Sequence, residues 1–372
     1  MKLLFVTLLF AFALAFAPHT LAQKPRPERY VEPPGAAAQE GVPPERHASA
    51  DPRAVVTVCL ESGDIIVRGW DRPEVRARLA EEGALRLLTP NVTPAPRVEV
   101  LVSNNMQVEP SPGSCGSNER LEVTVPRGAT VEVQSRSGQV EVTDVAEVRV
   151  RALSGDVDVR RVSQSVEVNC LSGDVSVSDS SGPVRITTTS GDVEARNVRS
   201  LSGADYFEAK SASGDLMLEG VSHRQVRGNV VSGSVLYTGA LARGGSYTFS
   251  TISGEVTMEL PANSSFSLHA KVVASGDIDT DFPVKATAGI ANGSAPAPPG
   301  APPARPGVPA PAPVPAPAPV VVIVPDPTGK PGKVKVKVPR EPTQAHLDGT
   351  VGTGDAVVNL SSFSGSLHLR KR

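Results

Sequence analysis

Short segments in which apolar and polar residues alternate recur along most of this chain, and they are organised around a repeated Ser-Gly dipeptide. Aligned on each serine, the residues three positions later and six positions earlier are apolar in all nine copies that keep register. The first column holds Ile65, Val140, Val157, Val175, Val193, Leu216, Val235, Val256 and Leu367. The second holds Val56, Val131, Val148, Val166, Val184, Phe207, Val226, Tyr247 and Val358. A period of two predicts half-buried strands rather than helices.

The repeat predicts an all-β fold, a β-solenoid of about 8–10 two-strand coils. One unit has too thin an apolar face to fold alone. When units stack, each strand pairs with its copy in the next unit, about 4.8 Å away, and the apolar faces merge into one core. An antiparallel sandwich also uses alternating strands, but it does not explain why the same dipeptide returns at every second strand. The copy at Ser275 slips by one position, which predicts a β-bulge there.

Glycine is expected at each corner of the solenoid because it adopts positive φ without a Cβ clash. The predicted structural turn glycines are Gly63, Gly138, Gly155, Gly173, Gly191, Gly214, Gly233, Gly254, Gly276 and Gly365.

Composition divides the rest of the chain into segments that the repeat does not cover. Residues 1–22 are predicted to be a signal peptide cleaved between Ala22 and Gln23, since an apolar run after Lys2 ends in small residues. The other predicted segments are a disordered Pro-rich linker (23–53), an irregular first unit or cap (54–136), the regular repeats (137–286), a Pro-rich insertion with a hairpin (287–343) and a last coil (344–372).

Charge and aromatic content narrow the function. The net charge of −2 provides no basic excess for nucleic acid. The apolar run of the leader is shorter than the roughly 20 residues that a membrane-spanning helix needs, and no other segment is long and apolar enough to span a membrane. Aromatic residues are 4% of the chain against 40% hydrophobic residues, so the core is expected to be narrow and aliphatic. We expect an exported protein of the periplasm, the cell surface or the medium.

The repeated Ser-Gly-Asp-Val-x-Val units resemble the bacterial putative-adhesin family of β-strand-repeat proteins. The matching pieces are Val125-Pro126-Arg127-Gly128, Leu260-Pro261-Ala262-Asn263 and the closing Phe363-Ser364-Gly365-Ser366-Leu367-His368-Leu369. The likeness covers about 54–286 and 344–372, and the Pro-rich insertion departs from a plain array. The resemblance implies an envelope-associated protein and transfers no catalytic residue.

Aspartate follows Ser-Gly at six corners, and stacked coils would set these carboxylates in a ladder. Calcium binding is one interpretation, but the nine-residue Gly-Gly-x-Gly-x-Asp motif of calcium β-rolls does not occur here. Turn formation explains Ser and Asp without a metal. No metal site, cofactor or catalytic set is predicted, because the histidines lack ligand spacing and no Gly-x-Ser-x-Gly elbow or phosphate-binding loop occurs.

The three cysteines separate by register. Cys170 falls in a column of small inward residues, which predicts a buried free thiol. Cys59 falls one position off that column, and Cys115 lies in a Pro/Gly/Ser loop. These two either form a disulfide across the first unit or remain free, because sequence does not supply the Cα separation that a bridge needs.

The function expected from these features is a non-enzymatic, adhesin-like or scaffold protein of the cell envelope. Its partner is an unidentified envelope or surface component, and self-association is open. Two alternatives remain: a polysaccharide-active β-helix enzyme, and a surface polymer assembled through uncapped coil ends.

Overall fold

The computed structural model describes residues 30–31, 44–105, 109–201, 205–286, 323–324, 334–337 and 345–372. The predicted signal peptide with its Ala22–Gln23 cleavage site, most of the linker and most of the Pro-rich insertion lie outside these residues. The described residues form strands and turns, without an α-helix. Accordingly, none of them belongs to a helix that would cross a membrane.

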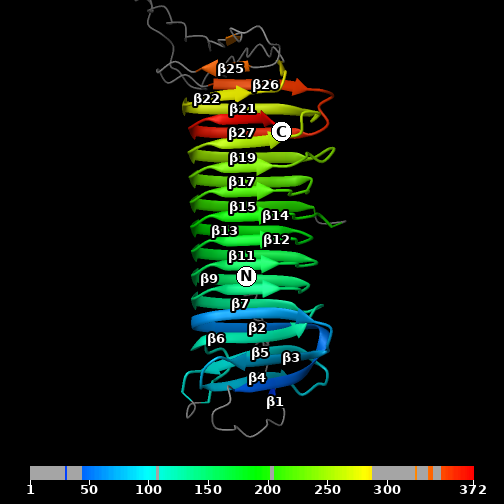
Figure 1. The fold of residues 1–372 in the computed structure, drawn as a ribbon, viewed down its shortest axis with the longest axis vertical. Coiled ribbons are helices and arrows are strands. Elements are labelled where there is room, and N and C mark those ends of the chain that lie inside the picture. The colour runs from blue at the N-terminus through cyan, green and yellow to red at the C-terminus, as the bar shows by residue number, and fades with distance from the viewer. Residues whose placement is uncertain are drawn as a thin grey trace, which may run out of the picture.

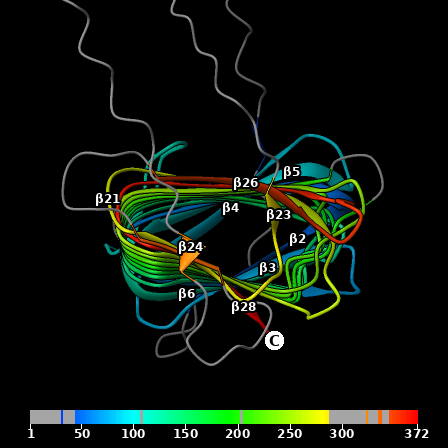
Figure 2. The same cartoon turned by 90° about the horizontal axis from the view of Figure 1, so that it is seen from above.

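The described strands stack into a long rod that is flattened in cross-section, with one strand series on each broad side (Figures 1 and 2). One series consists of β7 (Thr130–Ser137), β9 (Glu147–Ser154), β11 (Ser165–Ser172), β13 (Val184–Ser190), β15 (Tyr206–Ser213), β17 (Gln225–Ser232), β19 (Ser246–Ser253), β21 (Phe266–Ser275) and β27 (Val357–Ser364). The opposite series consists of β8 (Val140–Thr143), β10 (Val157–Arg160), β12 (Val175–Ser178), β14 (Val193–Arg196), β16 (Leu216–Glu219), β18 (Val235–Thr238), β20 (Val256–Leu260), β22 (Asp277–Thr280) and β28 (Leu367–Lys371). The fold is therefore the predicted β-solenoid.

Further strands complete the two ends of the rod. The first end holds β1 (Tyr30–Val31), β2 (Glu45–Trp70), β3 (Glu74–Leu79), β4 (Ala84–Pro90), β5 (Ala95–Ser103) and β6 (Gly116–Pro126). The other end holds β23 (Lys285–Ala286), β24 (Ile323–Val324), β25 (Val334–Lys337) and β26 (Ala345–Val351). β24 and β25 pair antiparallel, in the manner of the hairpin expected within the insertion.

The coils lie in parallel register. The corner serines of neighbouring coils are Cα partners, as Ser62 is of Ser137 and Ser154 is of Ser172. From Ser172 the same alignment continues, coil by coil, through Ser190, Ser213, Ser232, Ser253 and Ser364 to Ser275. The ten Ser-Gly corners therefore follow one edge of the rod. At about 4.8 Å per coil they extend over roughly 43 Å.

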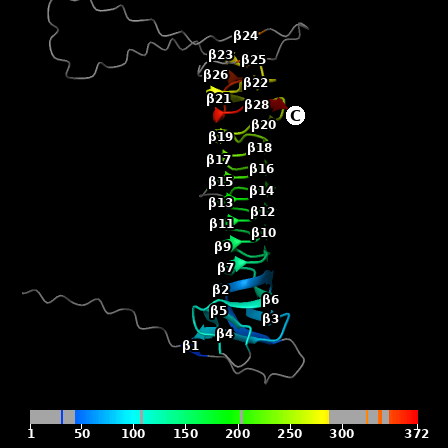
Figure 3. The same cartoon turned by 90° about the vertical axis from the view of Figure 1, so that its left-hand side faces the viewer.

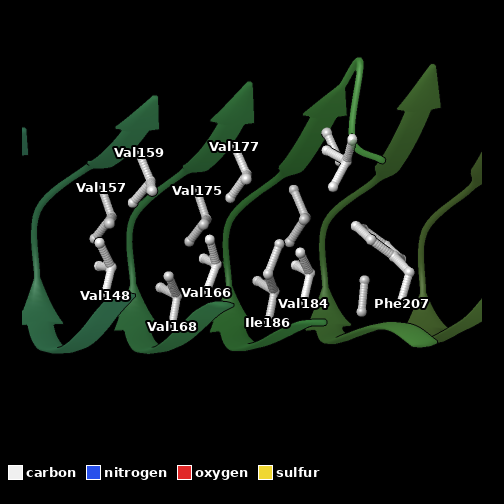
Figure 4. Packing of buried hydrophobic residues seen from close by; sticks show 14 of the residues in the cluster. Val148, Val157, Val159, Val166, Val168, Val175, Val177, Val184, Ile186 and Phe207 are labelled. Atoms are coloured by element: carbon white, nitrogen blue, oxygen red, sulfur yellow. The ribbon is translucent and has the colours of Figure 1, made fainter. Parts of the chain in front are cut away.

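Both apolar columns recognised in the sequence fill the interior. Their eighteen side chains are at most 2% exposed. Figure 4 shows Val148 and Val166 from one wall facing Val157 and Val175 from the other. Burying such aliphatic side chains stabilises the fold by about 1.5–3 kcal/mol each, so the continuous core compensates for the weakness of a single coil.

The order of coils along the rod departs from the order of the sequence at both ends. β27 pairs with β19 on one side and β21 on the other, so the last coil lies between two earlier ones (Figure 1). At the first end, β2 lies between β5/β6 and β7/β8. The register shift between Val272 and Ser275 in β21 is the bulge expected at that corner.

The linker boundary expected at residue 53 is too late, because β2 begins at Glu45. Ala48, Ala50 and Ala54 are buried, and the segment before Ala50 pairs antiparallel with β3. Alanine is too weakly apolar for this alternation to stand out among the surrounding Pro, Glu and Arg residues.

Antiparallel strands cover both ends of the stack. At the first end, β4 pairs antiparallel with β5, and β3 with β6. At the other end, β26 and β25 pair antiparallel with β21 and β22 (Figure 3). These strands break the parallel repeat, so within the described residues neither end of the rod presents the coil edge that would continue it.

His223 is a fully buried imidazole within the aliphatic core. Its Nε2 lies 2.8 Å from the carbonyl oxygen of Gly182 and donates to it, while Nδ1 has no hydrogen-bond partner among the described residues. Burial lowers the pKa of His223 below its ordinary value of 6.5, and the Gly182 contact opposes this shift only in part. The fold therefore holds the neutral ring.

We expect the free energy of unfolding to decrease as pH falls below about 6.5, because the unfolded chain then takes up a proton that folded His223 resists. In His223→Phe, the difference between melting temperatures at pH 7.5 and pH 5.5 should become smaller than in the wild type. The same substitution at His47 is the control, because its side chain is exposed and makes no hydrogen bond or ion pair among the described residues. An unchanged difference in His223→Phe would remove this histidine from the account of acid stability.

Candidate interaction surface

The corner glycines form a ladder that only glycine can build. All ten predicted turn glycines have positive φ, between 111° and 154°. A Cβ on Gly173 would lie 2.3 Å from the carbonyl oxygen of Gly155 in the coil below, and most corners show the same close approach to the preceding glycine. Conformation and crowding therefore both exclude a side chain at these glycine positions.

The aspartates beside the glycines connect one coil to the next. The backbone N–H of Asp192 donates to Asp174 Oδ1 at 2.8 Å, and the same bond links Asp174 to Asp156 and Asp215 to Asp192. Instead of bonding their own turn, as expected from the sequence, these carboxylates bond the following coil. Within the described part of the chain, no group of three or more His, Cys, Asp or Glu side chains is placed to hold a metal ion.

Asp174→Ala is expected to lower the free energy of unfolding by about 1 kcal/mol, because Asp192 loses its acceptor. Asp174→Asn keeps an oxygen at that position and should be close to neutral. Thermal unfolding with and without calcium measures both effects. A metal ladder would instead be supported if both variants lost the same free energy of unfolding and calcium raised the melting temperature of the wild type alone.

Exposed apolar side chains form a line along the same edge. They occupy the position just before the corner serine at five of the ten corners and are 47–52% exposed: Leu153, Leu171, Val231, Ile252 and Phe363. Cys170 and Ser172 align with Ala152 and Ser154, so Leu171 stacks on Leu153. Val231, Ile252 and Phe363 stack in the same way, whereas Thr189 and Ala212 occupy the middle. We call this line, from Leu153 to Phe363, the apolar ridge.

The apolar ridge spans seven coils, or roughly 29 Å at 4.8 Å per coil. Five of the ten large hydrophobic residues that the described chain exposes lie on it. Contiguous exposed apolar surface marks interaction sites on soluble proteins, while scattered single residues do not. The ridge is therefore the best candidate for a binding surface.

The broad face beside the ridge carries charges that alternate in sign from coil to coil. Register places Glu132, Arg149, Glu167, Arg185, Glu208 and Arg227 in one outward column. Arg149 lies 3.4 Å from Glu132, and Arg185 lies 3.4 Å from Glu208. Opposite charges on neighbouring strands favour this register over a shifted one, so the column has a structural role.

A shallow depression of about 430 Å³ lies at the foot of the ridge. Cys59 and Cys115 form a disulfide on its wall, with Cα atoms 4.9 Å apart. The remaining lining residues are Leu60, Glu61, Gln134, Ser135, Arg136, Arg151, Ala152 and Leu153. The bridge fastens the loop before β6 to β2, an arrangement that is typical of proteins folded in an oxidising compartment.

Cys170 is a buried free thiol in the inward column where the sequence placed it. Burial raises the pKa of its thiol, so the reactive thiolate is disfavoured. Cys170 therefore belongs to the core.

Strand pairing brings together two histidines that are far apart in sequence. His269 Nδ1 lies 2.8 Å from Asp348 Oδ1, and His346 Nε2 lies 2.5 Å from Asp348 Oδ2. All three side chains lie on the outward face of β21 and β26, and both imidazoles are more than half exposed. Sequence reasoning missed this group because it depends on the antiparallel pairing of β26.

The Toastrack DUF4097 family model matches residues 103–291, about half of the chain. A structure described as a putative cell adhesion protein from Clostridium sporogenes is 9% identical with a TM-score of 0.22, and covers 89% of this chain and 100% of its own. One described as a putative lipid binding protein from Parabacteroides distasonis is 11% identical with a TM-score of 0.30, and covers 59% of this chain and 91% of its own. No curated protein matches the chain.

Proposed function

The chain belongs to the Toastrack DUF4097 family, and we propose that it is a non-enzymatic, exported scaffold or adhesion module of the cell envelope. In this proposal the rod is a rigid support and the apolar ridge is its binding surface. The observation that carries the proposal is the line of five half-exposed apolar side chains along one edge of a regular stack. The resemblance to the putative-adhesin family of Ser-Gly-Asp-Val repeats supports the same function.

Export is supported by two independent features. The sequence begins with a predicted leader, and the Cys59–Cys115 bridge needs an oxidising environment to persist. The periplasm, the cell surface and the medium all satisfy both. The net charge of −2 favours a partner other than nucleic acid.

A polysaccharide-active enzyme is less well supported by the surface. Glycan sites generally use several aromatic rings along one groove, but Tyr237 and Tyr247 are fully buried in the core and Phe363 is the single aromatic residue of the apolar ridge. Tyr206 in β15 and Trp70 in β2 are partly exposed, but β7, β9, β11 and β13 lie between their strands in the stack. Assembly through coil ends is disfavoured by the antiparallel strands at both ends of the described rod.

Co-sedimentation of the purified protein with envelope fragments from its native cell tests the proposal. Wild type should sediment with the fragments, and the double variant Leu171→Glu/Ile252→Glu should lose most of this binding. Met217→Glu is the matched control, because Met217 is 43% exposed on the opposite broad face. Unchanged binding in the double variant, or turnover of a glycan by the wild type, would contradict the proposal.

A further inference from the structure

We propose that the apolar ridge binds the ridge of a second copy of this chain, with both rods pointing the same way. The inference rests on the proposed function and deepens it, because it makes the envelope component that the ridge binds a copy of the same chain. Three features carry it: the composition of the ridge, the charges on its two sides, and its area.

The large apolar side chains of the ridge are concentrated at its two ends. Its ends carry large side chains, Leu153 and Leu171 at one end and Ile252 and Phe363 at the other. Its middle carries the smaller Thr189 and Ala212. A two-fold axis parallel to the rod pairs each layer with itself, so the large apolar side chains at both ends of the ridge meet their own copies and bury apolar surface there. A perpendicular axis through Ala212 gives a similar match, so shape alone does not decide the direction.

Charge decides between the two directions. One side of the ridge is basic in two coils, because Arg151 and Lys210 lie two residues before the ridge residue of their coil. The other side is acidic in the same two coils, because Asp156 and Asp215 lie three residues after that ridge residue. A parallel pair brings opposite sides together, so Arg151 faces Asp156 and Lys210 faces Asp215 of the other copy. An antiparallel pair brings like sides together, so Asp215 of one copy faces Asp215 of the other copy. Opposite charges across a contact select the orientation, so the parallel pair is favoured.

Arg151 is suited to such a contact because it is exposed and makes no ion pair among the described residues. It also lines the depression at the foot of the ridge, where the apolar Leu153 and Ala152 lie beside it. Lys210 already lies 2.6 Å from Glu208, so its contribution is expected to be smaller.

The area of the ridge sets the strength of the contact. A strip about 29 Å long and about 10 Å wide covers roughly 300 Å², well below the ~800 Å² per partner of a stable complex. The pair is therefore weak in dilute solution and forms where copies are concentrated, as on an envelope. Parallel rods suit that setting, because proteins attached to one surface point the same way.

Cysteine cross-linking of the full-length chain tests both the partner and its direction. Leu153→Cys and Phe363→Cys are prepared separately, with tags of different size. The two variants are then mixed at high protein concentration and treated with a short bis-maleimide. The disulfide-bonded Cys59 and Cys115 do not react with this reagent, and Cys170 is buried. Met217→Cys, which is exposed away from the ridge, measures collisional background.

In a parallel pair each variant cross-links to itself well above the Met217→Cys background, while mixed 153–363 products are rare, since these positions would be roughly 29 Å apart. Arg151→Glu in the Leu153→Cys background should reduce the yield several-fold. Predominantly mixed products would overturn the parallel arrangement, and yields at background would overturn ridge pairing. Either negative result leaves the envelope-binding experiment to judge the proposed function separately.

Discussion

Gly173→Ala is expected to lower the free energy of unfolding by about 2–5 kcal/mol, the sum of backbone strain and overpacking. Gly173 has a φ of 131°, where an L side chain is strained in any surroundings. The new Cβ would also lie 2.3 Å from the carbonyl oxygen of Gly155, so the two coils must separate to admit it. The same separation would weaken the bond between Asp174 N–H and Asp156 Oδ1, which is 3.0 Å long.

Gly244→Ala separates the two causes. Gly244 also has positive φ, 67°, but a Cβ there has no neighbour within 4 Å. It should therefore show the conformational cost alone, about 1–2 kcal/mol. Denaturant unfolding followed by circular dichroism measures both variants. Equal losses at the two positions would mean that the crowding between coils has no energetic weight.

Phe249→Ala is expected to cost about 3–5 kcal/mol, because it removes a fully buried ring and leaves a cavity. Phe249 packs against Tyr237 with ring centroids 5.5 Å apart. Gly228, in the coil before it, provides the space for the ring, since a Cβ there would lie 2.8 Å from Phe249 Cδ1. Gly228 and Phe249 together show how a large residue is accommodated in a core made mainly of valine.

Phe363→Ala is the matched control for Phe249→Ala. Phe363 is 52% exposed on the apolar ridge, so its removal should change stability by about 0.5 kcal/mol or less. Thermal unfolding compares the two variants. A large loss in Phe363→Ala would show that the ridge belongs to the core of the fold, and its assignment as a binding surface would then fail.

Period-two alternation was sufficient to predict the interior. Positions such as Val166 and Val175 are apolar in every coil, and a half-buried strand must bury one of its two faces. The corner glycines followed from the same alignment, because a turn that recurs in register needs the same backbone conformation each time. These features are local or repeat with the sequence, which is why the fold could be predicted.

The order of coils could not be predicted because neighbouring corners are equivalent. Ser253 finds the same partner geometry in Ser364 as it would find in Ser275, so alternation does not distinguish the two. The apolar ridge was a different case, since Leu171 and Ile252 stand at the same position of the alignment. Its signal lies in this outward column, whereas the inward columns are sufficient to predict the fold.

The account depends most on coils lying in register, one layer above another, with the last coil inside the stack. Pulsed electron–electron distances between spin labels on Gln134→Cys and one outward position of the same broad face test this directly. The structure predicts roughly 29 Å to Ser250→Cys, 34 Å to Ser361→Cys and 38 Å to Lys271→Cys, at about 4.8 Å per layer. Distances that do not increase with layer number would contradict the solenoid. A longer distance to position 361 than to position 271 would place the last coil at the end of the rod and contradict its insertion.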